Sequence, residues 1–122
     1  MALDTSAGAL ILERLGAESA PLVPDAFDAD AYAGIRQMYR RQRIGRADVL
    51  AAVSYVHTFP AERVAVRPLL TAAVTLVDEV GAHDVFYILL AMQRGCALVT
   101  CDRGQAQAAT DLGVRAVYIP PA

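Results

Sequence analysis

The feature that most constrains this fold is a short apolar run, Ala97–Cys101, that follows a segment with helical periodicity. A nearly continuous apolar run of this length is typical of a strand buried on both faces of a parallel sheet. The preceding segment repeats apolar residues at i, i+3, i+4 and i+7, which predicts a helix from Asp84 to about Gly95. A helix over Gln105–Leu112 and a last strand at Arg115–Ile119 follow. Strands that alternate with helices imply right-handed crossovers and parallel pairing.

The rest of the chain alternates periodic apolar segments with turn residues in the same way. We expect, in order, a strand at Met1–Asp4, a helix through Leu15, a connection over Ala17–Pro24, a helix over Phe27–Arg41, a helix from Arg46 or Ala47 that ends before Pro60, a strand at Arg63–Val66 and a helix from Pro68 to Gly81. The sequence therefore predicts one α/β domain over residues 1–122, in which helices flank a short central parallel sheet to give three layers.

The composition indicates a folded domain, because 56% of the 122 residues are hydrophobic and 20% are charged. The formal net charge of −2 argues against a protein that coats nucleic acid through bulk positive charge. Asp4 stands where a signal peptide would need a basic region, and no apolar run is long enough to span a membrane, so we expect a cytoplasmic protein. Cys96 and Cys101 lack zinc-site spacing and are expected to be buried free thiols.

Three aspartates fall at junctions where parallel α/β folds bind ligands. Asp4 and Asp102 each end an expected strand, and Asp84 opens the helix that leads into the Ala97–Cys101 strand. Each could simply cap the helix that follows it. Asp30 is different, because it lies in an expected helix where an aspartate has poor propensity, although a solvent-exposed helix face would also explain it.

Carboxylates gathered in one cleft repel each other unless cations occupy the site. Mg²⁺ and Mn²⁺ suit ligand sets made only of oxygen, and phosphodiester hydrolysis is the natural chemistry of such a site. The spacing of the aspartates thus favours a metal-dependent nuclease.

At this point the sequence resembles the PIN-domain nucleases and, within them, the VapC-type toxins of bacterial toxin–antitoxin pairs. The matching motifs are the helix opening His83-Asp84-Val85, the strand end Leu98-Val99-Thr100-Cys101-Asp102-Arg103, the final Leu112-Gly113-Val114 and the opening Leu3-Asp4-Thr5-Ser6. The family's helical glutamate motif is similar to Phe27–Arg36, with Asp30 in the place of the glutamate. Asp28, which points to another helix face, is the alternative candidate.

The resemblance implies that Asp4, Asp84 and Asp102 bind one or two Mg²⁺ or Mn²⁺ ions, and that Asp30 helps to hold the second ion or the nucleophilic water. The reaction would be hydrolysis of RNA to 5′-phosphate and 3′-hydroxyl products. Hydroxyls that could orient carboxylates or water are those of Thr5, Ser6 and Thr100, or these could serve local turns.

The resemblance also implies a cognate antitoxin and a homodimer. Relatives commonly have an extra helix between the residues that correspond to Asp4 and Asp30, and this chain is shorter there, within part of the groove that receives the antitoxin. Two rival functions remain: a non-catalytic PIN module that binds RNA or protein, and a housekeeping RNA-processing nuclease.

Arginine supplies all 11 basic residues, and several crowd the segment after Asp30. Arg36, Arg40 and Arg43 share a helical face, which could be solvent-exposed or could contact RNA phosphate or an acidic antitoxin segment. Arg103 could touch the scissile phosphate or pair with a neighbouring carboxylate. For His83 we expect a surface or supporting position, and for Tyr87 the core or a dimer interface.

Overall fold

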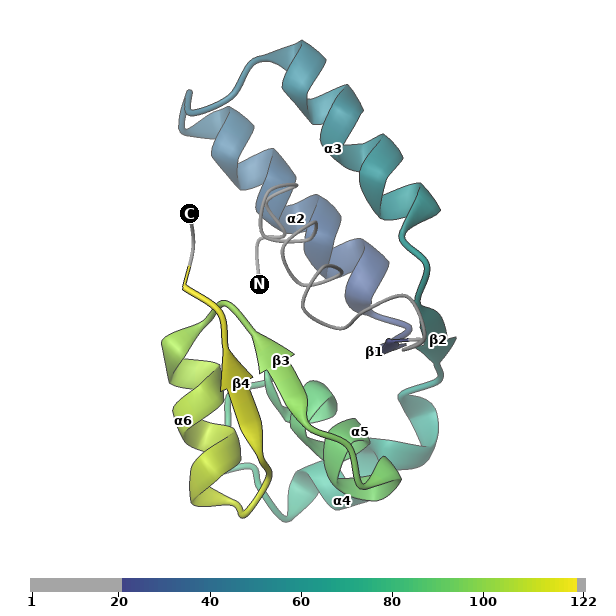
Figure 1. Cartoon of the computed structure of the whole chain (residues 1–122), viewed down its shortest axis with the longest axis vertical. Helices are drawn as coiled ribbons and strands as arrows, with labels where there is room; N and C mark the ends of the chain where they lie inside the picture. Colours follow the sequence, from purple (N-terminus) through teal and green to yellow (C-terminus); the bar gives the residue numbers. More distant parts are fainter. Residues whose placement is uncertain (1–20, 121–122) are drawn as a thin grey trace.

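The computed structural model describes residues 21–120, whose helices and strands alternate along the chain (Figure 1). The elements are β1 (Leu22–Pro24), α2 (Phe27–Arg40), α3 (Arg46–Thr58), β2 (Glu62–Val64), a 3₁₀ helix (Arg67–Leu69), α4 (Leu70–Val74), α5 (Val85–Arg94), β3 (Leu98–Thr100), α6 (Arg103–Asp111) and β4 (Ala116–Tyr118). The expected strand at Met1–Asp4 and the helix through Leu15 lie outside these residues, as do the site candidates Asp4, Thr5 and Ser6.

The described strands pair in parallel, as expected for an α/β fold. β1 pairs with β2, with Leu22 opposite Glu62, and β3 pairs with β4, with Leu98 opposite Ala116. α6 connects β3 to β4, whereas the α2–α3 hairpin connects β1 to β2. Within residues 21–120 the strands form two separate two-stranded sheets. We expected one central sheet, and these strands alone do not make it.

Helix α2 buries one stripe of side chains against α3. Phe27, Ala31 and Ile35 are spaced by four residues, and all three are buried. They pack with Val56, near the end of α3, and with Phe59, the first residue after α3. The ring centroids of Phe27 and Phe59 are 5.5 Å apart. The helix expected at Phe27–Arg41 and the helix expected from Arg46 are therefore confirmed, and they lie side by side in Figure 1.

Helix α5 lies in the core of the C-terminal part. Ile88 and Ala109 are fully buried and join α5 to α6 through a cluster that includes Leu98 of β3. The helix ends as predicted at Gly95, whose φ of 64° is a left-handed conformation that favours glycine. The sequence thus predicted this α5–β3–α6–β4 segment correctly, with shifts of a few residues at the ends.

Two expectations for the first half were wrong. Residues of the expected connection Ala17–Pro24 form β1, because the backbone of Leu22–Pro24 pairs with β2 even though the strand is too short to show an alternating pattern. The helix expected from Pro68 to Gly81 ends at Val74 and continues as turns. Its apolar periodicity was misleading, because Val74 and Val77 are 68% and 70% exposed and stabilise no helix by burial.

No disulfide joins Cys96 to Cys101, and Cys96 is exposed whereas Cys101 is only partly buried. Cys96 lies directly after the turn at Gly95, where the chain leaves α5 at the surface, so the expectation of a buried thiol there was wrong. No helix in residues 21–120 combines the length and the apolar character needed to cross a bilayer.

Arg63 of β2 ties the end of α3 to the start of α2. Its guanidinium binds both carboxylate oxygens of Asp28, with Nη2–Oδ1 at 2.8 Å and Nε–Oδ2 at 3.2 Å. It also donates to the backbone carbonyls of Val56, Phe59 and Ala61, where α3 ends. The Val56 and Phe59 carbonyls also accept the backbone N–H groups of Phe59 and Ala61. Arg63 therefore adds a charged donor to carbonyls at the end of the helix, where the regular helical hydrogen bonds stop.

We expect Arg63→Met to lower the free energy of unfolding by about 2 kcal/mol, because it removes a charged donor from several carbonyls at once. Asp28→Asn should cost less than about 1 kcal/mol, since the ion pair is partly exposed. Urea unfolding followed by circular dichroism measures both values. Equal losses in the two variants would contradict the importance of the carbonyl contacts.

Candidate metal-binding active site

Asp84 and Asp102 occupy the N-cap positions of two neighbouring helices. Asp84 precedes α5 and makes no side-chain cap bond, whereas the carboxylate of Asp102 accepts a hydrogen bond from the backbone N–H of Gln105 in α6. Asp102 therefore does cap its helix, as its position allowed, and Asp84 does not. The positive ends of both helix dipoles favour the two carboxylates there.

Gln105 links the two aspartates. Its backbone nitrogen lies 3.2 Å from Asp102 Oδ1, and its side-chain Nε2 lies 3.2 Å from Asp84 Oδ1. The side chain is only 2% exposed. The ends of two helices are thus joined through one buried residue.

The surroundings of Asp84 make its ionised form unfavourable. Burial raises the pKa of this carboxyl, and the charge of Asp102 raises it further. The hydrogen bond from Gln105 and the nearby His83 act in the opposite direction without cancelling the rise in pKa. A cation between these groups would remove the cost that their charges impose on each other.

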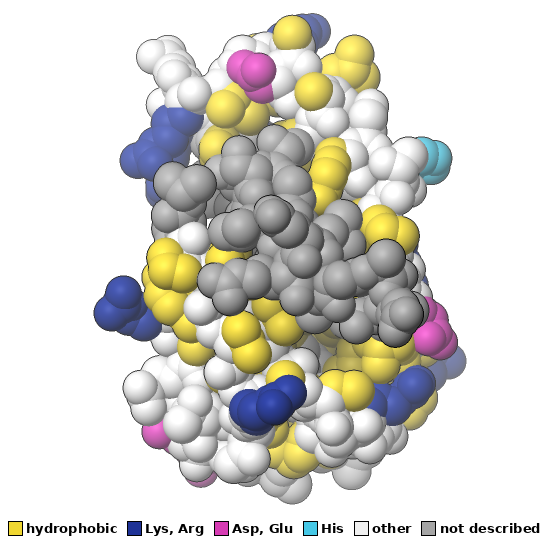
Figure 2. Space-filling view, viewed as in Figure 1, with side chains coloured by type: hydrophobic (Ala, Val, Ile, Leu, Met, Phe, Trp, Pro, Cys, Tyr) yellow, Lys and Arg dark blue, Asp and Glu magenta, His cyan; other side chains and the backbone are white. Residues whose placement is uncertain are grey.

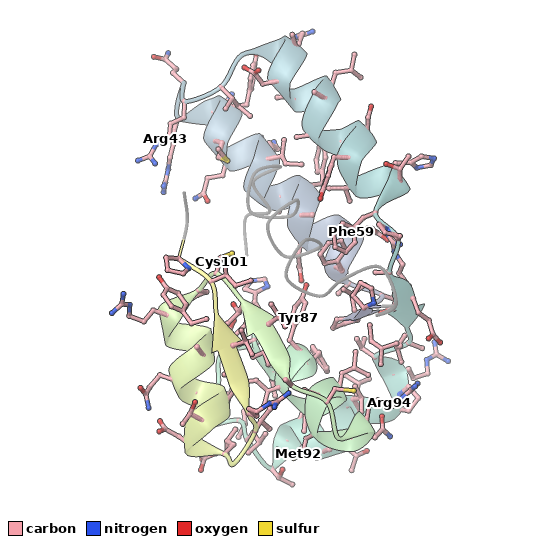
Figure 3. All side chains as sticks on the ribbon, in the orientation of Figure 1. Arg43, Phe59, Tyr87, Met92, Arg94 and Cys101 are labelled. Atoms are coloured by element: carbon pink, nitrogen blue, oxygen red, sulfur yellow. The ribbon has the colours of Figure 1, made fainter. Side chains whose placement is uncertain are left out.

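Asp30 approaches this region from α2. The structure starts α2 at Phe27, so Asp30 lies in the first helical turn, and its side chain is 20% exposed. The Asp30 carboxylate lies near Tyr87 of α5. Burial raises the pKa of Tyr87 strongly, and the charges of Asp30, Asp28 and Asp84 add to the effect. Figure 3 shows Tyr87 in the region between α2 and β3.

His83 lies next to this group, with Nδ1 3.8 Å from Asp30 Oδ1 and a side chain that is 82% exposed. This exposure agrees with the surface position that was one of the two alternatives for His83. Within residues 21–120, no three His, Cys, Asp or Glu side chains gather closely enough to hold one ion as they stand. The oxygen donors of Asp84 and Asp102 nevertheless fit Mg²⁺ or Mn²⁺ in type.

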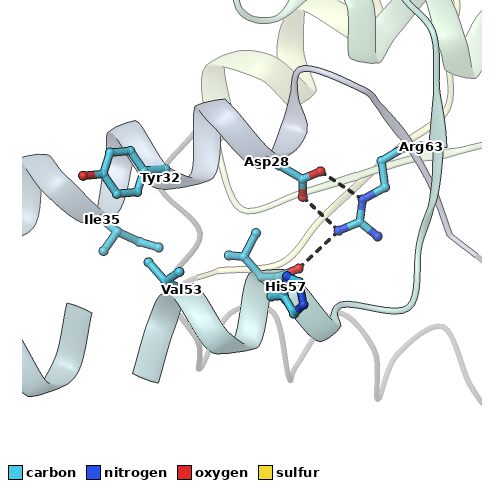
Figure 4. Close-up of a pocket in the computed structure, with 7 residues that line it drawn as sticks. Asp28, Tyr32, Ile35, Val53, His57 and Arg63 are labelled. Carbon is cyan, nitrogen blue, oxygen red and sulfur yellow. Dashed lines mark hydrogen bonds and ion pairs between the residues drawn. The ribbon is translucent and has the colours of Figure 1, made fainter. Parts of the chain in front are cut away.

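Asp28, the alternative to Asp30, faces a different environment. It lines a pocket of about 380 Å³ between α2 and α3, together with Arg63, Tyr32 and His57 (Figure 4). Both of its carboxylate oxygens bind Arg63. Asp30 pairs with no arginine within residues 21–120, which makes it the better metal-site candidate.

Known proteins were compared with the chain to test the resemblance. It is 33% identical over 105 residues to ribonuclease VapC12 of Mycobacterium tuberculosis, a match that covers 86% of this chain and 81% of that protein. It is 32% identical over 90 residues to ribonuclease VapC9 of the same species and to VapC ribonuclease Mb0985 of Mycobacterium bovis, which covers 70% of this chain and 71% of each relative. The chain belongs to the VapC ribonuclease family. No family model and no solved structure matches it.

Two supporting residues proposed from the VapC resemblance have defined contacts. The Thr100 hydroxyl oxygen accepts a hydrogen bond from the Asp102 backbone nitrogen at 3.0 Å, so it orients the backbone beside the carboxylate. The Arg103 guanidinium lies over the Tyr118 ring, 5.1 Å from its centroid. In the described part of the chain Arg103 forms no ion pair, so of its two alternatives the salt bridge to a neighbouring carboxylate is not made there.

The basic face that could bind RNA or an antitoxin is smaller than the sequence suggested. α2 ends at Arg40, and Gln42 has a left-handed φ of 59°, so Arg43 lies in the loop after the helix and does not continue the face of Arg36 and Arg40. All three side chains are exposed. Figure 2 shows basic side chains at several separate places on the visible face rather than joined in one patch.

Two residues at this site were not identified as such from the sequence. Gln105 follows Asp102 at the third helical position, where a capping box places a glutamine, but that pattern points to the backbone and not to Asp84. Tyr87 was expected only in the core or a dimer interface. Tyr87 lies three residues after Asp84, and residues with this spacing share one surface of a helix. That spacing was the sequence signal that could have placed Tyr87 near the site.

We expect Asp84→Asn to be more stable than the wild type at pH 7 in the presence of a chelator. Because the folded state raises the pKa of Asp84 above its ordinary value of 3.8, the folded protein holds this proton more tightly. That stabilisation is complete below pH 3.8 and is lost as the pH rises through the raised pKa. The asparagine removes the ionised group and should raise the melting temperature by a few degrees.

Thermal melts at several pH values measure this difference, which should shrink toward pH 4, close to the ordinary pKa of 3.8. Asp78→Asn removes an exposed carboxylate and serves as the control. A lower melting temperature for Asp84→Asn at pH 7 would show that Asp84 is not destabilised by its surroundings.

Proposed function

We propose that this protein is a metal-dependent endoribonuclease and the toxin of a type II toxin–antitoxin pair. The observation that carries the proposal is the close approach of Asp84 and Asp102, which Gln105 bridges at two helix N-termini. The names of the similar VapC proteins support ribonuclease activity. RNA is the proposed substrate, and a cognate antitoxin protein is the proposed partner.

The proposal includes the complete PIN fold. In it the two parallel strand pairs belong to one short central sheet, and helices cover both faces to give three layers. Membership of the VapC family supports this arrangement. One domain over residues 1–122, a cytoplasmic location and a homodimer remain parts of the proposal.

In the proposed site Asp84 and Asp102 hold Mg²⁺ or Mn²⁺, Asp4 completes the first set of ligands, and Asp30 supports a second ion or the attacking water. Such an ion would supply charge stabilisation at the phosphate and would lower the pKa of a water molecule. Tyr87 lies near Asp30 and is assigned to orienting that carboxylate. Arg36 and Arg40 are exposed and could contact the RNA backbone away from the carboxylates.

We expect Asp84→Asn and Asp102→Asn each to reduce RNA cleavage at least about 100-fold, since changes to supporting groups around a metal already cost about 10- to 100-fold. Asp30→Asn should have a smaller effect, because Asp30 is assigned to the second ion or the water. The measurement is cleavage of total RNA and of labelled oligonucleotides by the purified protein with Mn²⁺.

A chelator should abolish cleavage, and the exposed control Asp78→Asn should retain it. Equal cleavage by all variants, with or without chelator, would refute a metallonuclease. A folded protein that binds RNA and never cleaves it would instead support the non-catalytic binding module.

Expression in a bacterial host tests the assignment as a toxin. We expect induction of the wild type to arrest growth by at least about 10-fold in colony counts, and Asp84→Asn to abolish the arrest, because toxicity depends on RNA cleavage. Co-expression of the cognate antitoxin should restore growth. Active protein that cleaves RNA in vitro without affecting growth would favour a housekeeping nuclease.

A further inference from the structure

Gln105 is a buried polar residue whose side chain makes a hydrogen bond that is unusual for its position in the helix. It occupies the third position of α6, three residues after the N-cap Asp102. At this position a glutamine side chain commonly turns back and accepts a hydrogen bond from the backbone N–H of the N-cap residue. In this structure the side chain instead donates to Asp84, which precedes a different helix.

Thr100 explains why the glutamine is available for Asp84. The buried Thr100 hydroxyl oxygen already accepts the hydrogen bond from the Asp102 backbone nitrogen, at 3.0 Å. The usual partner of the Gln105 side chain at the start of α6 is therefore satisfied. The Gln105 amide can extend to Asp84, and its Nε2 lies 3.2 Å from Asp84 Oδ1.

The same residue also fixes Asp102. The Gln105 backbone N–H holds Asp102 Oδ1, and a Cβ at Gly104 would lie only 3.3 Å from that oxygen. Such a contact is closer than side chains normally make, so the glycine leaves the space that the carboxylate occupies. One buried residue and one glycine thus set the positions of one oxygen from each carboxylate.

The chemistry of an amide suits this role. A carboxylate has two oxygens, so one hydrogen bond from Gln105 leaves the other oxygen for a cation. An amide is a neutral donor, whereas a lysine ammonium carries a positive charge. The amide of Gln105 therefore does not neutralise the carboxylates and does not compete with the metal ion for them. Neutral donors behind metal ligands commonly orient those ligands.

We propose that Gln105 is a positioning residue that presets Asp84 and Asp102 for a divalent ion. This inference rests on the proposed nuclease function. It predicts that Gln105 acts on metal affinity rather than on the chemical step, because the residue is only 2% exposed and its amide contacts Asp84.

The experiment uses the full chain and its Gln105→Met variant, which keeps the length of the side chain and removes the amide. Mn²⁺ binding is measured from the electron paramagnetic resonance signal of free Mn²⁺ during titration. We expect the dissociation constant for Mn²⁺ to rise about tenfold. At saturating Mn²⁺ the cleavage rate should recover to near the wild-type value.

Gln105→Asn serves as the second variant. It keeps the amide but shortens its reach by one methylene, so it should weaken Mn²⁺ binding as Gln105→Met does. Melting in chelator reports whether each variant is folded, and two folded variants with weakened binding support the proposal.

Gln107→Met is the matched control, because Gln107 lies on the exposed surface of the same helix and donates to Asp111 at 2.8 Å. It should bind Mn²⁺ as the wild type does. Wild-type affinity in both Gln105 variants would overturn the role of Gln105 while leaving the nuclease proposal standing. A wild-type protein that binds no Mn²⁺ and cleaves no RNA would overturn both.

Discussion

Electrostatic repulsion between Asp84 and Asp102 is the constraint around which the C-terminal part of this protein is organised. Burial raises the pKa of Asp84, and the charge of Asp102 raises it further, so the pair costs stability when both groups are ionised. Helix α5 and helix α6 begin at these residues, and their dipoles reduce that cost. The buried contacts of Ile88 and Ala109 hold the two helices together and offset the remainder.

The acidic residues at the start of α2 have different partners because of helical geometry. Asp28 and Asp30 are two residues apart, which places them roughly 200° apart around the helix. Asp28 turns to Arg63 and stabilises the junction of α3 and β2, whereas Asp30 turns to Tyr87 of α5. One helical turn therefore serves both the α2–α3 hairpin and the candidate site. The ion pair at Asp28 fixes the start of the helix that carries Asp30.

The sequence predicted the elements that bury a regular apolar stripe and failed where burial was irregular. Helix α2 was recognised from Phe27, Ala31 and Ile35 because all of them enter the core. β1 was missed since a three-residue strand gives no period to detect, and the helix expected after Pro68 was too long because Val74 and Val77 face solvent. Apolar spacing predicts a helix only where another element covers it.

For the site, the sequence placed Asp84 and Asp102 at helix starts, and the resemblance singled them out as ligands. It could not predict their connection through Gln105, because the capping pattern points that side chain to the backbone of Asp102. Only the satisfaction of this backbone group by Thr100 redirects the glutamine, and such competition between acceptors depends on tertiary distances. Asp4 lies outside the described residues, so its part in the site stays a prediction.

Neutral groups, rather than arginines, lie next to the candidate carboxylates. Gln105 donates to Asp84 and Tyr87 lies near Asp30, while in residues 21–120 no arginine forms an ion pair with Asp84, Asp102 or Asp30. The adjacent Arg103 lies over the Tyr118 ring instead. A guanidinium would neutralise a carboxylate and occupy its oxygens, as Arg63 does at Asp28. The amide of Gln105 fixes Asp84 in position and preserves its charge, so the attraction for a divalent cation is retained.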